Sequence, residues 1–389
     1  MTAFERINTF HNWMREIRHD LHAHPEIGFE EKRTAALVAD ALRSFGIAVY
    51  EGVGQTGVIG VLQQGTSSRS IGLRADMDAL PMAEENSHLS YRSRVPNRMH
   101  ACGHDGHTAM LLGTARYLAE TRNFDGTVIF IFQPAEEGLG GAQAMLEDGL
   151  FDRFPCDMIF GMHNSPGQPL GTFRTAAGPL MAAGAFFDID ITGVGTHAAR
   201  PEGGIDPVVI ATQTVLALQT IVSRNLSPLQ SAVLSVTRLE APTNAYNVVP
   251  HGVNLGGTVR CFESALLENI GERLTQIATQ TAAAYGATAH VSFRTIFAPT
   301  INDASAVDLY AQAATRLLGA ENVSTDAALI MGSEDFGFML AQRPGAYGML
   351  GSGDGFPPHH PRYDFNDEIL PAGAALYVEL ATLGLARSQ

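Results

Sequence analysis

The sequence predicts an α/β protein with two domains: a larger one with a central mixed sheet covered by helices, and a smaller ferredoxin-like α+β domain inserted into it. At 389 residues the chain is too long for one ordinary domain and suits two. Near-continuous apolar strands alternate with helical patterns in the first third, which is typical of a sheet buried on both faces. Past residue 183 the strands alternate apolar and polar residues, and the first pattern returns after residue 295. We therefore expect the larger domain at 1–183 and 295–389 and the inserted one at 184–294.

Apolar spacing and stop residues predict the helices of the first third. Residues 10–26 carry apolar side chains at helical spacing up to Pro25, and residues 30–46 form an amphipathic pattern that Gly46 closes. A third helix is expected over about 108–120. Buried strands are expected at 56–62, 70–76, 126–132 and 156–163.

The inserted segment has a different order of elements. Strand, helix, strand, strand, helix and strand follow one another, which is the split βαβ pattern of a ferredoxin-like domain. After it, the sequence predicts a helix at 304–318 and a strand at 345–351. The elements of the inserted segment are expected at 186–193, 206–224, 231–240, 253–262, 264–285 and 288–294.

Composition excludes several classes of function. The 25 basic and 40 acidic residues give a net charge of -15 without a basic cluster, which argues against a nucleic-acid partner. No apolar run approaches the roughly 18–20 residues that span a bilayer, and the N-terminus lacks the pattern of a secretory signal. Three cysteines, odd in number and widely spaced, do not suggest a disulfide framework. We expect a cytoplasmic protein without a membrane partner.

Side chains that bind metals stand at the ends of the predicted strands. In open α/β sheets, sites gather outside the carboxyl ends of the strands, so four separate segments can converge there. One thiol, several imidazoles and one or two carboxylates suit a borderline metal such as zinc and tolerate cobalt, nickel or manganese. The candidates are Cys102, His104, Glu136, Glu137, His163 and His360.

The two adjacent glutamates are expected to have different roles, because neighbouring side chains in an extended segment point to opposite sides. One would bind metal and the other would take a proton from a water molecule. The residues alone leave open which is which. Taken singly, Cys102 could be core filler, the glutamates a solvated loop and His163 a hydrogen-bonded core histidine. His100, His107 and His359 are placed outside the ligand set.

Eight stretches, in order from about residue 15 to 370, resemble one known family. It is a group of metal-dependent amidohydrolases and peptidases that includes hippurate hydrolases, N-acyl-L-amino-acid amidohydrolases and plant auxin-conjugate hydrolases. The stretches are LHAHPEIGFEE, GLRADMDALPM, MHACGHDGHTAMLLGTA, FQPAEEG, GVGTHAARP, NVVPHGVNLGGTVR, GSEDF and HHPRYDFND.

The resemblance implies a role for each candidate. Glu136 would be the general base that deprotonates the attacking water and later delivers the proton to the leaving amine. Where the broader group has a His-x-Asp motif, this chain has Asp76-Met77-Asp78, so Asp78 would at most orient a ligand. The ligands of a centre with two divalent metal ions, zinc or manganese before cobalt or nickel, would be Cys102, His104, Glu137, His163 and His360.

The resemblance also gives roles to the inserted domain, which corresponds to a lid and dimerisation domain. His197 matches a histidine that reaches the active site, in many members from the partner subunit, and stabilises the oxyanion. Asn247 and Arg260 match substrate-binding positions, and an arginine fork fits a substrate carboxylate. A homodimer or higher homo-oligomer is expected.

The predicted activity is metal-dependent hydrolysis of the amide bond of an N-acyl-L-amino acid, giving a carboxylic acid and the free amino acid. A dipeptidase or a deacylase of N-acetyl-diaminopimelate on the same scaffold is the nearest alternative. A cysteine amidase with Cys102 as nucleophile and a metal-dependent binding protein without turnover are the more distant alternatives. The presence of Glu136 argues against a role in binding alone.

Overall fold

The computed structural model describes residues 2–386 and divides them into two compact units, which we treat separately. Unit 1 contains the chain up to residue 180, residues 300–329 and the chain from residue 335 onward. Unit 2 contains residues 181–299 and 330–334. The predicted boundaries lay after residues 183 and 294, and the prediction kept residues 330–334 in the larger domain. No helix in the described part of the chain is long and apolar enough to cross a membrane.

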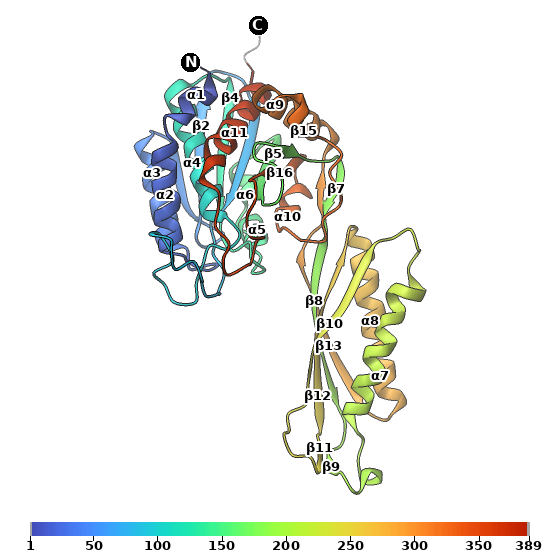
Figure 1. Cartoon of the computed structure of the whole chain (residues 1–389). Helices are drawn as coiled ribbons and strands as arrows, with labels where there is room; N and C mark the ends of the chain where they lie inside the picture. Colours follow the sequence, from blue (N-terminus) through green and yellow to red (C-terminus); the bar gives the residue numbers. More distant parts are fainter. Residues whose placement is uncertain (1, 387–389) are drawn as a thin grey trace. The chain divides into compact units, whose positions relative to one another are not determined.

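Unit 1 is built on an eight-stranded mixed sheet (Figure 1). Its central strands β4, β3, β5 and β16 run parallel, whereas β1 pairs antiparallel with β2, β2 with β4, and β6 with β16. The edge strand β15 pairs parallel with β6. This arrangement confirms the predicted α/β fold with a mixed sheet. In spatial order the strands are β1 (Ala48–Val53), β2 (Gly57–Gln64), β4 (Gly126–Gln133), β3 (Ser70–Asp76), β5 (Met158–Ser165), β16 (Gly345–Gly351), β6 (Phe173–Arg174) and β15 (Val323–Ser324).

Helices alternate with the strands of this sheet along the chain. The helix expected at 108–120 begins four residues earlier, which places His104 in its first turn. The helices of unit 1 are α1 (Ala3–Asn8), α2 (His11–Ala23), α3 (Lys32–Ser44), α4 (His104–Thr121), α5 (Gly141–Glu147), α6 (Leu150–Arg153), α9 (Ala304–Leu318), α10 (Gly337–Leu340) and α11 (Leu370–Gly384), with 3-10 turns at Ala320–Asn322 and Asp367–Ile369.

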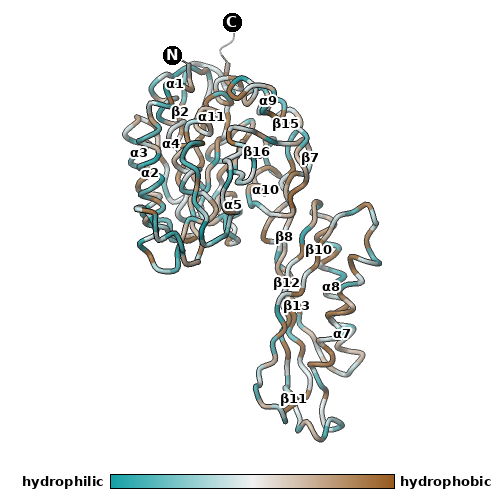
Figure 2. Tube along the Cα trace, in the orientation of Figure 1, coloured by the Kyte–Doolittle hydropathy of each residue, from teal (hydrophilic) through white to brown (hydrophobic). Residues whose placement is uncertain are grey.

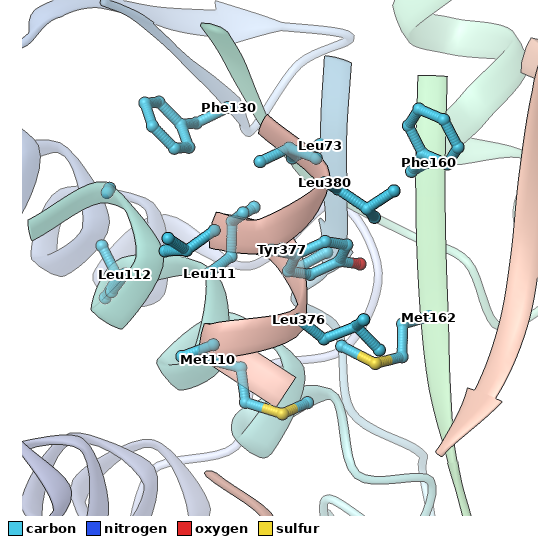
Figure 3. Close-up of a cluster of buried hydrophobic side chains, with 14 of the residues drawn as sticks. Leu73, Met110, Leu111, Leu112, Phe130, Phe160, Met162, Leu376, Tyr377 and Leu380 are labelled. Carbon is cyan, nitrogen blue, oxygen red and sulfur yellow. The ribbon is translucent and has the colours of Figure 1, made fainter. Parts of the chain in front are cut away.

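The main core lies between the sheet and α4 and α11. Figure 3 shows Leu73 of β3 and Phe130 of β4 facing the same cluster as Leu111 of α4 and Leu376 of α11. Alternate residues of β4, such as Ile131, are also buried but point to the opposite face. Because both faces are covered, the strands are apolar at nearly every position.

Unit 2 has a four-stranded antiparallel sheet in the order β10-β12-β8-β13. Along β8, buried residues such as Phe187 and Ile189 alternate with exposed or half-buried ones such as Asp188, and Figure 2 shows the mixed hydropathy of these strands. One face therefore packs on the two helices and the other meets solvent. The elements are β8 (Ala183–Thr192), α7 (Pro207–Thr220), β10 (Ala232–Glu240), β12 (Gly252–Cys261), α8 (Ser264–Ala284) and β13 (Thr288–Phe297).

Short elements complete the described chain. A two-stranded sheet formed by β9 and β11 lies at one end of unit 2. These elements are β9 (Thr196–His197), β11 (Val248–Val249), a 3-10 turn at Pro201–Gly203, a π-helical turn at Ile221–Asn225, and the paired strands β7 (Gly178–Met181) and β14 (Thr300–Asn302).

Candidate metal centre

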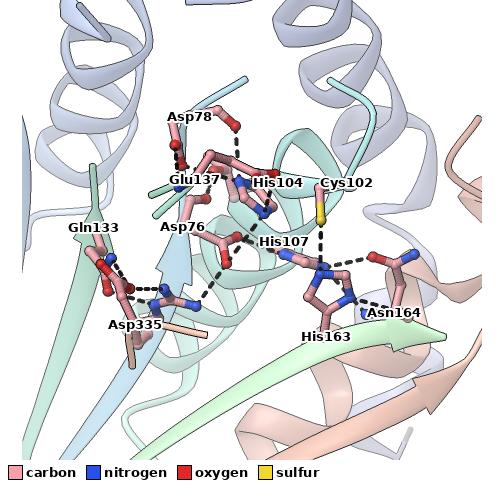
Figure 4. A network of polar contacts seen from close by, with 12 residues as sticks. Asp76, Asp78, Cys102, His104, His107, Gln133, Glu137, His163, Asn164 and Asp335 are labelled. Atoms are coloured by element: carbon pink, nitrogen blue, oxygen red, sulfur yellow. Dashed lines mark hydrogen bonds and ion pairs between the residues drawn. The ribbon is translucent and has the colours of Figure 1, made fainter. Parts of the chain in front are cut away.

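The carboxyl ends of the parallel strands meet at one edge of the sheet in unit 1, and the predicted ligands gather there (Figure 4). β5 carries His163 near its end, and the turn after β4 carries Glu136 and Glu137. Cys102 and His104 come from the loop that starts α4. The positions agree with the general rule that sites form outside the carboxyl ends of strands in open sheets.

Glycine lets the α4 loop pack this closely. Gly103 has φ +103°, a left-handed conformation that favours glycine. A Cβ there would lie 2.4 Å from the Asn164 Oδ1 atom and 2.6 Å from the Tyr363 hydroxyl. Any larger residue would push Cys102 and His104 away from β5.

Four predicted ligands and the predicted base fall into two overlapping groups whose ligand atoms lie within 4.8 Å: Cys102, His104 and His163 in one, and His104, Glu136 and Glu137 in the other. The Cys102 Sγ atom lies 3.2 Å from His163 Nε2, and His104 Nε2 lies 4.0 Å from Glu137 Oε1. The structure thus brings together four of the five predicted metal ligands and the predicted base.

Hydrogen bonds of the histidine Nδ1 atoms determine which ring nitrogen faces this centre. His104 Nδ1 lies 2.9 Å from the Asp78 carbonyl oxygen and 3.2 Å from its carboxylate, so this nitrogen donates and Nε2 is the one that faces the centre. His163 Nδ1 similarly lies 2.7 Å from the Asn164 carbonyl oxygen. Burial lowers the pKa of His163 to about 3, so this ring is neutral, as a metal ligand must be.

Asp78 holds a second part of the centre. Its other carboxylate oxygen accepts a 3.0 Å hydrogen bond from the Glu137 backbone N–H. Asp78 therefore connects His104 to the turn that carries the two glutamates, which is the orienting role suggested by the sequence.

The donor set fits a divalent cation. His104 Nε2 and Glu137 Oε1 are buried atoms that make no hydrogen bond among the described residues, and the nearest group of opposite charge type to Glu137 Oε1 is the His359 ring, at 3.3 Å. Such atoms are costly to bury alone, and a cation between them would satisfy both. Burial raises the pKa of the Cys102 thiol, so metal binding there would have to displace its proton.

The structure places His359, and not the predicted ligand His360, beside the other candidate ligands. His359 Nε2 lies 3.3 Å from Glu137 Oε1, and His359 forms a group of potential ligands with Cys102 and Glu137. The ring of His360 instead stacks on Phe356 with centroids 4.3 Å apart. The backbone of His359 is left-handed, with φ +66°, its N–H donates to the Ala101 carbonyl oxygen, and its ring lies on the side of Glu137. Neighbouring side chains diverge, and the motif HHP alone does not decide between them.

A buried polar network beside the centre was not anticipated. His107 Nδ1 lies 2.6 Å from Asp76 Oδ1, and its Nε2 lies 2.8 Å from Asn164 Oδ1. Arg74 donates to the other Asp76 oxygen at 2.7 Å. The alternation in GLRAD placed Arg74 and Asp76 on one face of β3, but nothing in the sequence paired them with His107.

The remaining predicted residues lie in unit 2. His197 and Asn247 line one surface groove at the end of the sheet where β9 pairs with β11. His197 Nδ1 accepts a 3.1 Å hydrogen bond from the Ala199 backbone N–H, which leaves its Nε2–H as an exposed donor.

Arg260 lies in the four-stranded sheet of unit 2, at the end away from β9 and β11, where it pairs with Gly184 of β8. Its guanidinium donates to the Ser333 hydroxyl and stands over the Phe297 ring. No carboxylate among the described residues lies within ion-pair distance of it.

Comparison with known proteins shows consistent likenesses. Residues 72–383 match the model of Peptidase family M20/M25/M40. The chain is 42% identical over 366 residues to a hippurate hydrolase of Campylobacter jejuni, covering 94% of this chain and 95% of that one. It is 38% identical over 385 residues to the IAA-amino acid hydrolase ILR1-like 4 of Arabidopsis thaliana, covering 96% and 86%.

A solved structure is also similar. The Bacillus subtilis YXEP protein, a dinuclear metal binding peptidase from M20 family, superposes with a TM-score of 0.83 at 35% identity. The match covers 97% of this chain and 99% of that chain.

Proposed function

Because the chain belongs to Peptidase family M20/M25/M40, we propose that it is a metal-dependent amidohydrolase that cleaves N-acyl-L-amino acids to a carboxylic acid and a free amino acid. The observation that carries the proposal is the cluster of the buried Cys102, His104 and His163 with the partly buried Glu137, and with Glu136 beside it. The named activities of the hippurate and IAA-amino acid hydrolases support the same bond and substrate class.

Two divalent metal ions are proposed for this centre, in line with the dinuclear peptidase of similar fold. Zinc or manganese are the first candidates, with cobalt or nickel next, because thiol, imidazole and carboxylate occur together. Such ions would polarise the amide carbonyl and lower the pKa of a bound water. The residues proposed to hold them are Cys102, His104, Glu137, His163 and His359.

Glu136 is the proposed general base. It is 6% exposed and its carboxylate lies within 4.8 Å of ligand atoms of His104 and Glu137, so it can reach a water held there. It would take the proton of the attacking water and pass it to the amide nitrogen as the C–N bond breaks. Because Glu137 faces His104, the two glutamates divide the roles of base and ligand.

The cysteine-amidase alternative is less consistent with the environment of Cys102. A nucleophilic cysteine needs a lowered pKa, whereas burial raises the pKa of this thiol. The neutral His163 ring 3.2 Å from the thiol supplies no positive charge, and the interactions of Cys102 with His104 and His359 do not offset the effect of burial on its pKa.

Arg260 is the proposed contact for the substrate carboxylate. It is half-buried, and burial lowers its pKa, yet no acidic residue near it balances the charge. Ser333 holds one of its nitrogens, which leaves the rest of the fork for a ligand. This arrangement favours substrates with a free carboxylate.

Unit 2 is the proposed ferredoxin-like lid and dimerisation domain, and His197 is proposed to act on the partner's substrate. His197 and Arg260 lie at opposite ends of the sheet, separated by about eight residues of β12, or roughly 26 Å at the rise of a strand. No small N-acyl amino acid spans that distance, so the two side chains can serve one substrate only from different copies.

Edge strand β10 and the exposed Val209 and Leu216 of α7 are the surface proposed for the second copy. His197 would stabilise the oxyanion and Asn247, on the same groove, would contact substrate.

A substrate panel tests the proposal. Metal-free protein would be supplied with one metal at a time and assayed on N-benzoylglycine, N-acetyl amino acids, dipeptides and N-acetyl-diaminopimelate. We expect release of free amino acid from the N-acyl amino acids and faster turnover of these than of dipeptides. Preference for dipeptides or for the diaminopimelate conjugate would support the alternative activities, and no turnover with any metal would contradict the proposal. The cytoplasm remains the predicted compartment.

A further inference from the structure

Glu31 carries a fully buried carboxylate whose two oxygens both accept hydrogen bonds from distant parts of unit 1. Although Glu31 stands at the start of α3, its side chain does not cap that helix. One oxygen accepts from the Thr56 hydroxyl at 2.6 Å and the other from the Ala135 backbone N–H at 2.8 Å. Glu31 is 0% exposed, so both bonds are shielded from water.

Ala135 is the residue that sets the direction of the two glutamates that follow it. Its φ is +52°, in the left-handed region that is unfavourable for any residue with a Cβ atom. Such a conformation persists only where its surroundings impose it. The surroundings of Ala135 therefore decide where Glu136 and Glu137 point.

Close packing restrains this turn from two sides. A Cβ on Gly28 would lie 2.9 Å from the Ala135 Cα atom, and a Cβ on Gly141 would lie 1.6 Å from the Pro134 carbonyl oxygen. The Gly141 N–H also donates to the Ala135 carbonyl oxygen at 3.0 Å. Packing restrains the turn, and the Glu31 carboxylate supplies the hydrogen bond for its N–H group.

We propose that Glu31 is a positioning residue that holds the left-handed turn at Ala135 and thereby aims Glu136 at the metal centre. With Asp78, which accepts from the Glu137 N–H at 3.0 Å, it gives each of the two N–H groups flanking Glu136 a buried carboxylate partner. Both hydrogen bonds are shielded from water, and a hydrogen bond in such surroundings is stronger than one in water, which suits a turn that must not move. The effect on turnover rests on the proposed function, whereas the restraint on the turn does not.

The test compares Glu31→Ala and Glu31→Gln with Glu26→Ala. Glu26 lies in the same segment, but its carboxylate accepts from the Arg33 and Thr34 N–H groups and so caps α3. At saturating metal we expect Glu31→Ala to lower kcat about tenfold or more with KM changed less than about twofold, because displacement of a base by a fraction of an ångström slows chemistry. Glu31→Gln keeps an acceptor for Ala135 and should stay within about threefold of wild type. Glu26→Ala should lower the melting temperature and leave kcat unchanged.

Hydrogen exchange of the metal-free protein gives a second readout that does not depend on activity. Glu31→Ala should speed exchange of the peptide 134–141 about tenfold, whereas peptides from α11 should exchange as in wild type.

Three outcomes would each overturn the inference: unchanged kcat in Glu31→Ala, an equal loss of kcat in the alanine and glutamine variants, or unchanged exchange at 134–141. Should Glu31→Ala not fold, Glu31→Asp replaces it, because its shorter side chain cannot reach Thr56 and Ala135 together. If wild type hydrolyses no acylated amino acid, the proposed function fails and the exchange data still decide the role of Glu31.

Discussion

Hydrogen bonds to one ring nitrogen of His104 and of His163 orient each ring so that its other nitrogen faces the centre. The Asp78 oxygens take the Nδ1–H of His104, and the Asn164 carbonyl takes that of His163, so the Nε2 atom of each ring faces the cluster. Cys102 and the partly buried Glu137 add a sulfur atom and a carboxylate oxygen beside them. At the scale of single residues, this arrangement is what allows a cation to bind.

The pair His359 and His360 offers a matched test of the ligand set. His359→Ala should weaken metal binding at least about tenfold, the size of effect seen even for residues that only orient a ligand, and should lower turnover with it. His360→Ala removes a ring that rests on Phe356 and should leave metal affinity within about twofold. Competition with a chromogenic chelator measures both variants. A loss of affinity in His360→Ala with none in His359→Ala would restore the original choice of ligand.

The unpaired guanidinium of Arg260 leads to a prediction about specificity. Arg260→Met should raise KM for N-benzoylglycine about tenfold or more, because a charged hydrogen bond to the carboxylate is lost. The carboxamide of the same substrate lacks that charge and should be hydrolysed slowly and at equal rates by both proteins. Steady-state kinetics on the acid and the amide measures this difference. Parallel losses on both substrates would show that Arg260 does not recognise the carboxylate.

At the scale of elements, a buried ionic network ties α2 to the start of α4. His22 Nδ1 lies 2.9 Å from Asp105 and its Nε2 lies 3.3 Å from Glu84, while Arg18 of the same helix approaches Asp105 at 3.5 Å. The buried His100 ring also faces His22, with centroids 6.4 Å apart. Although burial alone would lower it, hydrogen bonds to Asp105 and Glu84 raise the pKa of His22 to about 9.

This network predicts how stability depends on pH. The folded state holds the His22 proton more tightly than the unfolded chain, whose pKa is 6.5, so the stabilisation is complete below pH 6.5 and is lost as pH rises through about 9. Its full size is roughly 3 kcal/mol, from 1.4 kcal/mol per pKa unit. Denaturant unfolding of metal-free wild type and His22→Gln from pH 6 to 9.5 measures it. The free energy of unfolding should fall more steeply for wild type, and parallel curves would contradict the prediction.

Elements with a strong period were predictable from the sequence, and long-range polar pairings were not. The spacing of apolar residues predicted the observed bounds of α9, 304–318, and those of α8 to within one residue, because this spacing reflects which face of a helix is buried. The start of α4 was missed because its N-cap is Gly103, which has no side chain that could mark the start of a helix in the sequence. Cys102 and His163 could be placed at one sheet edge by topology alone. The pairing of Glu31 with Ala135 could not, because 104 residues separate them.

At the scale of the whole molecule, unit 2 carries at its two ends residues proposed for one reaction. His197 lies near the β9 end and Arg260 near the end where the chain enters and leaves the unit. If both act on one substrate, as proposed, the two residues come from different copies of the chain.

Mixing two inactive variants tests this arrangement. Glu136→Gln and His197→Ala homodimers should both be nearly inactive. After subunit exchange at equal amounts, half of the dimers are mixed and one of their two sites has both residues intact, so about a quarter of wild-type activity should return. Gel filtration confirms that the mixed species are dimers. Absence of recovered activity in verified mixed dimers would show that His197 acts within its own subunit or not at all.

The most direct measurement is metal reconstitution of the stripped wild type beside Glu136→Gln, with bound metal and N-benzoylglycine hydrolysis followed in the same samples. Wild-type turnover should vanish on stripping and return as metal binds. Glu136→Gln should bind the metal with similar affinity yet turn over about 100-fold or more slowly, because only the proton acceptor is lost. Wild-type turnover that persists without metal, or a glutamine variant that is as active as wild type when loaded, would contradict a metal-dependent hydrolase with Glu136 as its base.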